Sequence, residues 1–357
     1  MYQKITIFLL VALNCFSSFS QSVEKKDTTD TRHTLKEVEI TAWQQRKILS
    51  GLLSGKIKLN VAELNTLPRF LGETDALRTM KLMPGVLTTG ELNSGFYVRG
   101  SESSHNQILL NGAPIYNAMH MLGFFSVFNS GHMNTFTLYK SHLEGGRLSA
   151  TLDMQTRDTL VSKPTVSGNI GIIASQATVA LPLGKKVSVY LSGRKTYLGL
   201  LVKPLTTKMT DTPVDYDFED YNATFVFQPS EKDKVTANFY YGSDYLDIET
   251  GIYQTEGRIK WSNIAASILW NRPLGRIGEM THTFYITRYK NRLNISQNQF
   301  TAWLPSEITD YGYKNIFSFR EEKFLGTYGL EYVYHHMYPQ IVETQGAYTI
   351  HTDPDSR

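Results

Sequence analysis

Apolar and polar residues alternate one by one over most of the second half of the chain. Val187, Val189 and Leu191 are separated by serine or tyrosine, and the same period of two recurs at 235–241, 264–270 and 327–334. This period is typical of β-strands with one apolar and one polar face. From about Val166 onward the pattern predicts antiparallel strands, about eight or nine in number, in place of helices.

The segments between these strands differ in length in a regular way. Short polar turns are expected at 183–186, 229–233, 272–277 and 320–323, and long loops at 195–216, 244–257 and 292–312. Outer-membrane barrels have short periplasmic turns and long external loops. A soluble β-sandwich also alternates apolar and polar residues, but it has no reason to alternate loop length. The pattern therefore favours transmembrane strands.

Residues 60–156 have a mixed pattern. Apolar residues at every third position predict a short helix from Asn60 to Leu67 and a second helix capped by Thr74, whose buried stripe is Leu77, Met80 and Met83. Strands are expected at 95–99, 107–110, 134–140 and 151–156. The dipeptide at 111–112 is Asn-Gly, which favours a tight hairpin. These elements predict a small α+β domain.

The N-terminus has the pattern of a secretory signal peptide. Lys4 precedes a nine-residue apolar run, and Ser18 and Ser20 supply a small-x-small cleavage site, which gives a signal peptide at 1–20. The run is too short to span a bilayer, which takes about 20 residues. Cys15, the single cysteine, also allows a lipoprotein signal, but Asn14 stands where such signals need a small residue.

Residues 21–59 are expected to form a flexible linker. The segment 21–34 is polar and charged, so it buries too little apolar surface to fold. Within the linker, residues 35–42 alternate apolar Val38 and Ile40 with polar residues, which is the pattern of a single strand without a local partner. Such a strand can pair with the sheet edge of another protein. A chance Val-x-Ile in a plain linker is the alternative.

Several ordered runs resemble the plug domain of TonB-dependent outer-membrane receptors. They are the segments 95–100 (GFYVRG), 108–117 (ILLNGAPIYN) and 123–129 (GFFSVFN) together with His120, and shorter matches at 71–78, 83–86 and 145–149 follow the same order. Residues 217–223 and 230–245 are similar to early barrel strands of that family. Asn111 stands where the family more often has Asp, and residues 21–34 leave no room for the β-sandwich extension of many relatives.

The resemblance implies an α+β plug domain at 60–157, followed by antiparallel transmembrane β-barrel strands at 160–357. The barrel is incomplete, with about 8–9 of roughly 22 strands. At about 10 residues a strand, the whole barrel needs more residues than follow Leu160. The chain is therefore expected to be a fragment, located in the outer membrane of a Gram-negative cell.

The resemblance also implies roles for particular residues. The TonB box at 35–42 is expected to contact TonB, which works with ExbB and ExbD, through Leu35, Glu37, Val38, Ile40 and Thr41. Charged groups on a plug and on the barrel wall must pair when they are buried, so Arg99 and Arg147 are the expected plug-to-barrel contacts, with ordinary surface arginines as the alternative. The expected ligand-facing residues at the plug apex are Tyr116, Met119 and His120.

Composition and motifs exclude several other functions. The net charge is only +3, with 36 basic and 33 acidic residues, which gives no indication of nucleic-acid binding. Met119, His120, Met121, His132 and Met133 allow a copper site, but methionine beside phenylalanine is ordinary packing, so we expect no metal and no cofactor. Serine, histidine and aspartate occur in no catalytic pattern, so an enzyme is not expected.

The expected function is energy-coupled uptake of a scarce solute, such as a metal chelate or an oligosaccharide. The alternative is a secreted or outer-membrane module that binds a ligand or signals without transport. A passive porin would need neither a plug nor a TonB box. Specificity in such receptors lies in the plug apex and the external loops, so the sequence does not name the solute.

Overall fold

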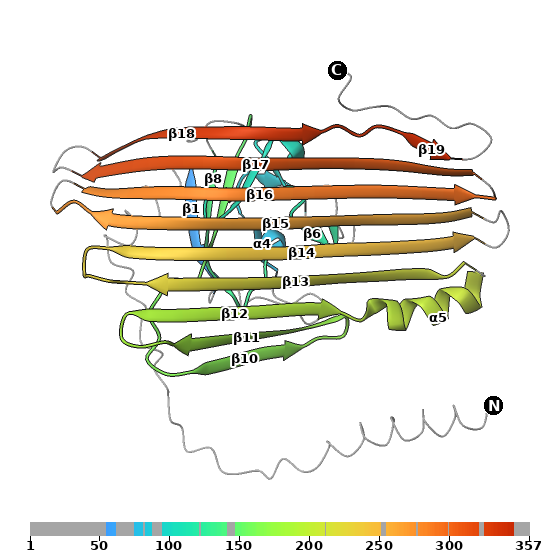
Figure 1. The fold of residues 1–357 in the computed structure, drawn as a ribbon, viewed down its shortest axis with the longest axis horizontal. Helices are drawn as coiled ribbons and strands as arrows, with labels where there is room; N and C mark the ends of the chain where they lie inside the picture. The colour runs from blue at the N-terminus through green and yellow to red at the C-terminus, as the bar shows by residue number, and fades with distance from the viewer. Residues whose placement is uncertain are drawn as a thin grey trace, which may run out of the picture. The chain divides into compact units, whose positions relative to one another are not determined.

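The computed structural model describes residues 55–61, 75–80, 83–87, 95–120, 123–140, 147–210, 212–250, 255–275, 278–298, 300–320 and 325–345 (Figure 1). All of them belong to the second of two compact units, which begins at Ile48. The expected signal peptide, the TonB box and the first predicted helix beyond Val61 lie outside the described residues. Among the helices that are described, none has the length and apolar character needed to cross a bilayer.

The described residues between 55 and 156 form a small module built on a five-stranded sheet with the order β1-β8-β9-β4-β5. Its strands are β1 (Lys56–Asn60), β4 (Gln107–Leu110), β5 (Ala113–Pro114), β8 (Met133–Tyr139) and β9 (Thr151–Thr156). The pair β4–β9 is parallel and the other neighbours are antiparallel. Two short hairpins and two helical segments complete the module: β2 (Val86–Leu87) with β3 (Tyr97–Val98), β6 (Met119–His120) with β7 (Phe125–Ser126), α4 (Ala76–Met80) and η1 (Ser103–His105).

The apolar stripe of the second predicted helix reaches the core of this module. Leu77 and Met80 are fully buried and pack in one cluster with Phe136, Leu138 and Leu152. Burying each such side chain contributes roughly 1.5–3 kcal/mol. The predicted stripe is thus confirmed, and it places α4 on the small sheet.

The cap of this helix is Asp75 and not the predicted Thr74. Asp75 directly precedes α4, and its Oδ1 accepts a hydrogen bond from the backbone N–H of Arg78 at 3.1 Å. Its Oδ2 accepts a second bond from the backbone N–H of Ser126 at 2.6 Å. A carboxylate satisfies an orphan N–H at a helix start, and here it also ties α4 to β7.

The boundary between linker and domain also needs correction. Residues 56–59 were assigned to the flexible linker, but they belong to β1, which pairs with β8 over five residues from Lys56–Tyr139 to Asn60–Thr135. The alternation of Ile57 and Leu59 with lysines is a strand pattern, and both side chains pack against the core cluster. The small module therefore begins before residue 60.

The predicted Asn-Gly hairpin is confirmed. Asn111 and Gly112 have φ values of 50° and 78° and connect β4 to β5, which are paired at Leu110–Ala113. Positive φ at both central residues is the geometry of the tight turn that Asn-Gly favours. The side-chain Oδ1 of Asn111 also accepts a hydrogen bond from the backbone N–H of Thr156 at 3.0 Å, which joins the turn to the end of β9.

The rest of the described chain forms a large antiparallel sheet. Nine of its described strands follow one another in sequence order, and β19 pairs with β17 off this path. The strands are β10 (Thr165–Ile170), β11 (Ala174–Pro182), β12 (Val187–Thr196), β13 (Val214–Phe227), β14 (Lys234–Thr250), β15 (Thr255–Pro273), β16 (Gly278–Gln297), β17 (Phe300–Arg320), β18 (Leu325–Tyr338) and β19 (Glu343–Gln345).

The short turns at 183–186 and 229–233 are confirmed, those at 272–277 and 320–323 lie partly outside the described residues, and the three long loops are not found. The described residues 244–250, 255–257, 292–297 and 300–312 belong to paired strands, so β14 to β17 each have 17 to 21 residues. The segment 195–216 contains helix α5 (Leu198–Thr210). These segments read as loops because their outward side chains are charged, yet hydrogen bonds between neighbouring strands do not depend on that charge.

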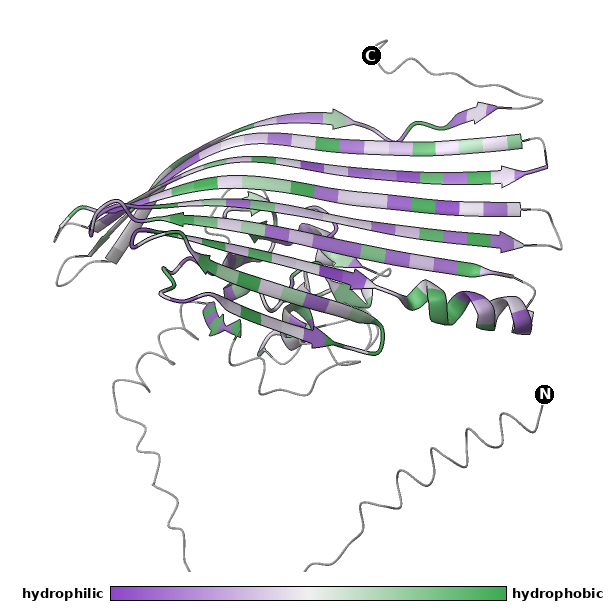
Figure 2. Ribbon diagram, turned by 60° about the horizontal axis from the view of Figure 1, so that its bottom comes forward, coloured by the Kyte–Doolittle hydropathy of each residue, from purple (hydrophilic) through white to green (hydrophobic). Residues whose placement is uncertain are grey.

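The two faces of the large sheet differ in composition. One face carries buried polar side chains, among them Ser188, Thr224 and Asn263. The other exposes large apolar side chains, among them Leu191, Phe225, Phe239, Ile268 and Phe284. Figure 2 shows this alternation along the strands. The small module lies against the polar face, which we call the inner face (Figure 1).

Candidate functional site between the small module and the large sheet

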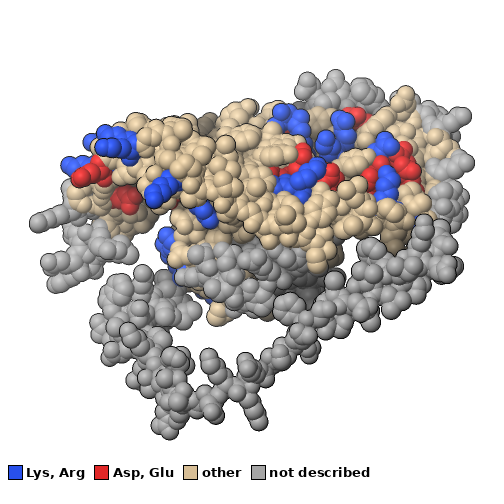
Figure 3. All heavy atoms as spheres, turned by 90° about the horizontal axis from the view of Figure 1, so that it is seen from below, with Lys and Arg blue, Asp and Glu red and all other residues tan. Residues whose placement is uncertain are grey.

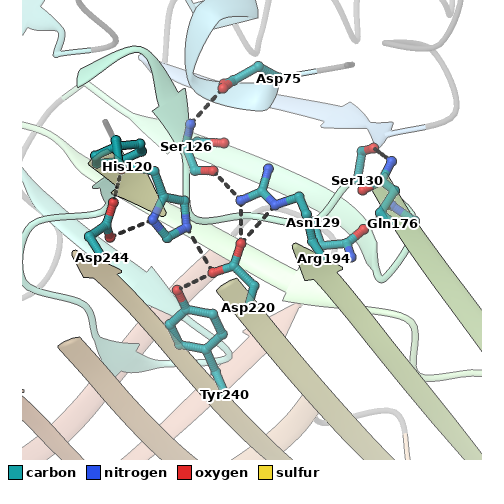
Figure 4. A network of polar contacts seen from close by, with 12 residues as sticks. Asp75, His120, Ser126, Asn129, Ser130, Gln176, Arg194, Asp220, Tyr240 and Asp244 are labelled. Atoms are coloured by element: carbon teal, nitrogen blue, oxygen red, sulfur yellow. Dashed lines mark hydrogen bonds and ion pairs between the residues drawn. The ribbon is translucent and has the colours of Figure 1, made fainter. Parts of the chain in front are cut away.

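A buried cluster of charged side chains joins the small module to the inner face (Figure 4). His120 of β6 is at its centre, with 1% of its surface exposed. Its Nδ1 lies 2.6 Å from Oδ2 of Asp244 on β14, and its Nε2 lies 2.8 Å from Oδ1 of Asp220 on β13. One imidazole of the module is therefore held between carboxylates of two neighbouring strands.

Arg194 of β12 completes the charge balance of the cluster. Its Nε and Nη2 donate to Oδ2 of Asp220 at 2.7 and 2.5 Å, and Nη2 also donates to the backbone carbonyl of Ser126 at 2.6 Å. The guanidinium thus donates hydrogen bonds both to a carboxylate of the large sheet and to a backbone carbonyl of the small module. The two cations, His120 and Arg194, and the two carboxylates, Asp220 and Asp244, give the cluster no net charge. Pairing of this kind offsets the free-energy cost of removing charges from water.

Two tyrosines of the sheet satisfy the remaining carboxylate oxygens. Tyr240 donates to Oδ1 of Asp220 at 2.9 Å, and Tyr216 donates to Oδ1 of Asp244. The ring of Phe218 stacks on His120 with centroids 4.4 Å apart, and the Arg194 guanidinium lies 5.2 Å from the centroid of the same ring. This aromatic cover excludes water and strengthens the charge interactions.

His120 is an imidazolium in this arrangement. Ionised carboxylates only accept hydrogen bonds, so both ring nitrogens must donate, and that requires a proton on each. Burial alone would lower the pKa of His120, but the charges of Asp220 and Asp244 outweigh it and raise the pKa to about 9. The cluster is therefore charged at neutral pH.

Gly242 of β14 makes room for the cluster. It lies between Tyr240 and Asp244 on the inner-face side of the strand, and a Cβ there would overlap the Tyr240 hydroxyl and come within 2.8 Å of Oδ1 of Asp220. Glycine in a strand interior usually marks the close approach of another group. Here that group is the hydroxyl that bonds Asp220.

A second set of contacts lies near the end of β9. His132 Nε2 lies 2.9 Å from Oγ1 of Thr224, and Thr156 donates to Oδ1 of Asn238 at 2.9 Å. Burial, and then the charge of Arg157, lowers the pKa of His132 to about 4. His132 is therefore neutral, in contrast to His120.

A third contact joins Tyr116 to Asp310 of β17. The phenol donates to Oδ2 at 2.6 Å, and His335 of β18 reaches Oδ1 of the same carboxylate at 2.8 Å. Burial and this hydrogen bond raise the pKa of Tyr116. The three sets of contacts join the module to β12, β13, β14 and β17, so it is held at several places on the inner face.

The three residues expected to face a ligand have different neighbours in the structure. His120 and Tyr116 contact the large sheet, and Met119 is half-buried against the module core. Arg99 is exposed. Arg147 donates to the Ser104 carbonyl at 3.1 Å and lies 5.9 Å from the Tyr116 ring, so these contacts stay within the module.

The idea of paired charges between module and wall holds for other residues. The wall supplies Arg194, Asp220 and Asp244, and the module supplies His120. The sequence contained a usable signal for the three residues of the sheet. Each stands two residues from inward-facing neighbours on its strand, so its charge also faces inward. A charge at an inward position needs a partner, but the sequence does not say that the partner is His120.

One group of three acidic side chains comes together among the described residues. Asp247, Glu249 and Glu256 place their carboxylates within 4.8 Å of one another. Arg258 pairs with Asp247 at 3.3 Å and also with Glu256. Two of the three carboxylates thus have a protein partner, and the arginine offsets part of their negative charge.

No protein-family model and no curated protein sequence matches the chain. Solved structures do match it. The outer membrane transporter YddB from Escherichia coli is 12% identical, with a TM-score of 0.58 over 82% of this chain and 53% of that one. The siderophore receptor PirA from Acinetobacter baumannii is 14% identical, with a TM-score of 0.55 over 81% of this chain and 49% of that one.

The copper transporter OprC is 12% identical, with a TM-score of 0.59 over 85% of this chain and 49% of that one. The chain thus spans about half the length of the solved structures it matches. At such low identity the likeness concerns the fold alone. The described residues share a fold with outer-membrane receptors and transporters.

Proposed function

We propose that the chain is part of a TonB-dependent outer-membrane receptor that imports a scarce solute. In this proposal the small module is the plug, the large sheet is part of the transmembrane barrel, and residues 1–20 are the signal peptide. The structures compared above include a siderophore receptor and a copper transporter. A metal chelate or an oligosaccharide remains the solute class that we propose.

The observation that carries the proposal is the arrangement of polar contacts on the inner face. Apolar packing also joins the two parts, since Phe125 of the module packs with Phe218 and Trp261 of the sheet, but apolar contacts are not directional. Here the fully buried pair His120–Asp220, at 2.8 Å, and the Asp244 contact hold the module to the wall. The outer face meanwhile exposes Phe225 and Phe284, which suits contact with lipid.

Such a polar joint suits a part that has to move. Charged hydrogen bonds are directional and can be exchanged for bonds to water when a gap opens. A large apolar interface has no such replacement. Once water enters, Asp220 keeps Arg194 as a partner, while Asp244 keeps the Tyr216 hydroxyl. The carboxylates of the large sheet therefore keep hydrogen-bond partners when His120 moves away, whereas an opened apolar interface would expose apolar surface to water.

Force from the inner membrane would act through residues 35–42, which lie outside the described residues. The first described strand after this segment is β1, at the edge of the small sheet beside β8. A pull on the N-terminal side of Lys56 would load an edge strand first. Edge strands have hydrogen bonds on one side only, so they detach at lower cost than central strands.

The test combines location with TonB binding. Cells expressing the chain are fractionated on a density gradient, and Val38→Cys is oxidised in the presence of a TonB periplasmic domain that carries a cysteine on its exposed edge strand. We expect the chain in the outer-membrane fraction and a disulfide-linked adduct with TonB. Val38→Pro should abolish binding of the same TonB domain, because proline removes a donor of the added strand.

Val23→Pro is the matched control, since Val23 lies in the polar segment before the box. It should leave TonB binding unchanged. A chain recovered in the soluble periplasmic fraction would contradict the membrane part of the proposal. Equal binding by the Val38→Pro and unchanged chains would contradict the energy-coupling part and favour a module that only binds a ligand or signals.

A further inference from the structure

A cavity of about 820 Å³ lies beside α5. Its lining from the helix includes Leu200, Pro204 and Lys208, and its lining from the sheet includes Lys195 and Asp217. Arg194 and Asp220 face inward, and side chains alternate along a strand. Lys195 and Asp217 therefore place the cavity on the outer face of the sheet. Its volume lies in the range of about 300–1,000 Å³ that is usual for ligand sites.

The wall of the cavity is largely apolar, although it is open to the surroundings. Leu200 is 79% exposed and stands one helical turn before Pro204. A second apolar row of α5, formed by Leu201, Leu205 and Met209, is also exposed. Apolar residues gathered on an exposed helix indicate contact with a partner or with a membrane.

One lysine at the cavity has no ion pair among the residues that the structure describes. Lys195 pairs with Asp217 at 2.8 Å and with Glu219 at 3.2 Å, and Lys203 pairs with Asp215 at 3.1 Å. Lys208 is exposed at the C-terminal end of α5, and it makes no ion pair with the residues that the structure describes. Figure 3 shows acidic and basic side chains gathered together in groups, with uncharged surface between the groups. Lys208 is therefore the cation at the rim of the cavity that can meet an anion.

The height of the cavity along the sheet follows from the outward residues of β13. Asp217 and Glu219 come first, then Tyr221, then Phe225 and Phe227, all on the same face. Tyr221 stacks on Tyr241 with centroids 6.4 Å apart. Tyrosines mark the interface of a bilayer, between its apolar interior and its headgroups. The cavity lies beyond this aromatic pair, at the level of headgroups.

We propose that this cavity binds one membrane lipid with a net-negative phosphate headgroup. The acyl chain lies against Leu200 and Pro204, and the phosphate lies beside Lys208. A helix rises about 1.5 Å per residue, so Lys208 is about 12 Å beyond Leu200 along α5, farther from the apolar band. The two ends of the site thus follow the polarity of a lipid. This inference rests on the proposed function, because it needs the sheet to be inserted in a membrane.

The test uses the full chain, purified in dodecyl maltoside and stripped of lipid. Palmitoyl-oleoyl phosphatidylglycerol, its phosphatidylcholine counterpart and inorganic phosphate are added separately, and native mass spectrometry counts the bound molecules. We expect one phosphatidylglycerol per chain, weaker binding of phosphatidylcholine and no binding of phosphate. A phosphatidylglycerol with a photoreactive acyl chain should crosslink to peptides from 198–210.

Two variants with matched controls locate the site. Lys208→Gln removes the free cation from an exposed position, so folding is not at risk, and binding should weaken about fivefold, as expected for one basic residue near a membrane surface. Lys185→Gln, in the exposed turn at the other end of β12, should have no effect. Leu200→Asp should abolish the crosslink, whereas Leu183→Asp, in that same turn, should retain it.

Phosphatidylcholine binding as tight as phosphatidylglycerol, equal binding by Lys208→Gln, or crosslinks confined to β14–β16 would overturn the proposed lipid site. Competition by inorganic phosphate would show that the site recognises a free anion, which would also overturn it. Cell fractionation separates this result from the proposed function. A chain found in the outer membrane without bound lipid contradicts only the lipid site, whereas a soluble chain contradicts the receptor itself.

Discussion

The imidazole Nδ1 of His120 lies 2.6 Å from a carboxylate oxygen of Asp244, although the two residues are 124 positions apart and belong to different sheets. With its second contact to Asp220, this bond makes His120 the one module side chain that touches both wall carboxylates among the described residues. The position of the small module on the large sheet should therefore depend on this single side chain more than on any apolar neighbour.

Replacing His120 by glutamine should destabilise the docked module strongly. Glutamine removes the positive charge, so the buried carboxylates of Asp220 and Asp244 are neutralised only in part, by Arg194. Breaking a buried ion pair in this way costs about 3–5 kcal/mol. Denaturant unfolding in detergent, followed by near-ultraviolet circular dichroism, measures the change. His105→Gln is the control, because the His105 side chain is 40% exposed. Its replacement should change stability by about 0.5 kcal/mol or less.

The docked module should lose stability as the pH rises above neutrality. The pKa of His120 is raised from 6.5 to about 9, so the folded state holds a proton that the unfolded state releases. The contribution of His120 is complete below pH 6.5 and disappears as the pH rises through 9. Unfolding measured from pH 6 to 10 should show this decline, and His120→Gln should flatten it. An equal decline in both proteins would assign it to other groups.

His132 should act in the opposite direction. Its pKa is lowered from 6.5 to about 4, so below pH 6.5 the unfolded state binds a proton that the folded state refuses. Stability should therefore fall as the pH falls from 6.5 to about 4. His132→Gln keeps a polar group at the level of Nε2, which contacts Thr224, and does not titrate. In unfolding experiments over pH 4 to 7 it should reduce the slope that the unchanged protein shows.

Gly242→Ala should loosen the charged cluster without touching any charged residue. The added methyl group overlaps the Tyr240 hydroxyl, so the bond from Tyr240 to Asp220 must lengthen or break. Overpacking of this kind costs about 1–3 kcal/mol. Gly257→Ala, in the neighbouring strand β15, is the control because a Cβ there meets nothing within 4 Å. Equal denaturation midpoints for the two variants would contradict the role given to Gly242.

The sequence predicted the features that depend on local pattern. The Asn111–Gly112 hairpin, the bounds of β9 and the short turns at 183–186 and 229–233 follow from turn chemistry and from the period of two. The charged cluster could not be predicted, because it joins residues from distant strands. A single sequence shows that Asp220 is charged, and it does not show which module side chain lies opposite.

The long strands were missed for a related reason. Residues 244–250 carry charged side chains on their outward side, so they lack the apolar signal of a strand, yet they keep their pairing with β15. The edge strand β1 was missed because it is only five residues long and follows a polar linker. Short strands at the end of a linker depend on tertiary partners more than on propensity.

The small module should fold in water without the large sheet, provided that β1 is included. A polypeptide of residues 55–156 retains the core around Phe136 and all five strands of the small sheet. At about 100 residues it is large enough for a marginally stable domain. A polypeptide of residues 61–156 lacks β1, so β8 loses its partner from Lys56 to Asn60 and the core loses the packing of Ile57 and Leu59.

Circular dichroism and thermal unfolding of the two polypeptides provide the measurement. We expect a cooperative transition for 55–156 and a lower midpoint, or no transition, for 61–156. Residues 165–345 should aggregate in water, because Phe225, Phe239 and Phe284 belong to a contiguous exposed apolar surface. A soluble monomer of residues 165–345 would contradict the lipid-facing role of the outer face. Equal midpoints for the two module polypeptides would show that β1 does not stabilise the module and belongs to the linker.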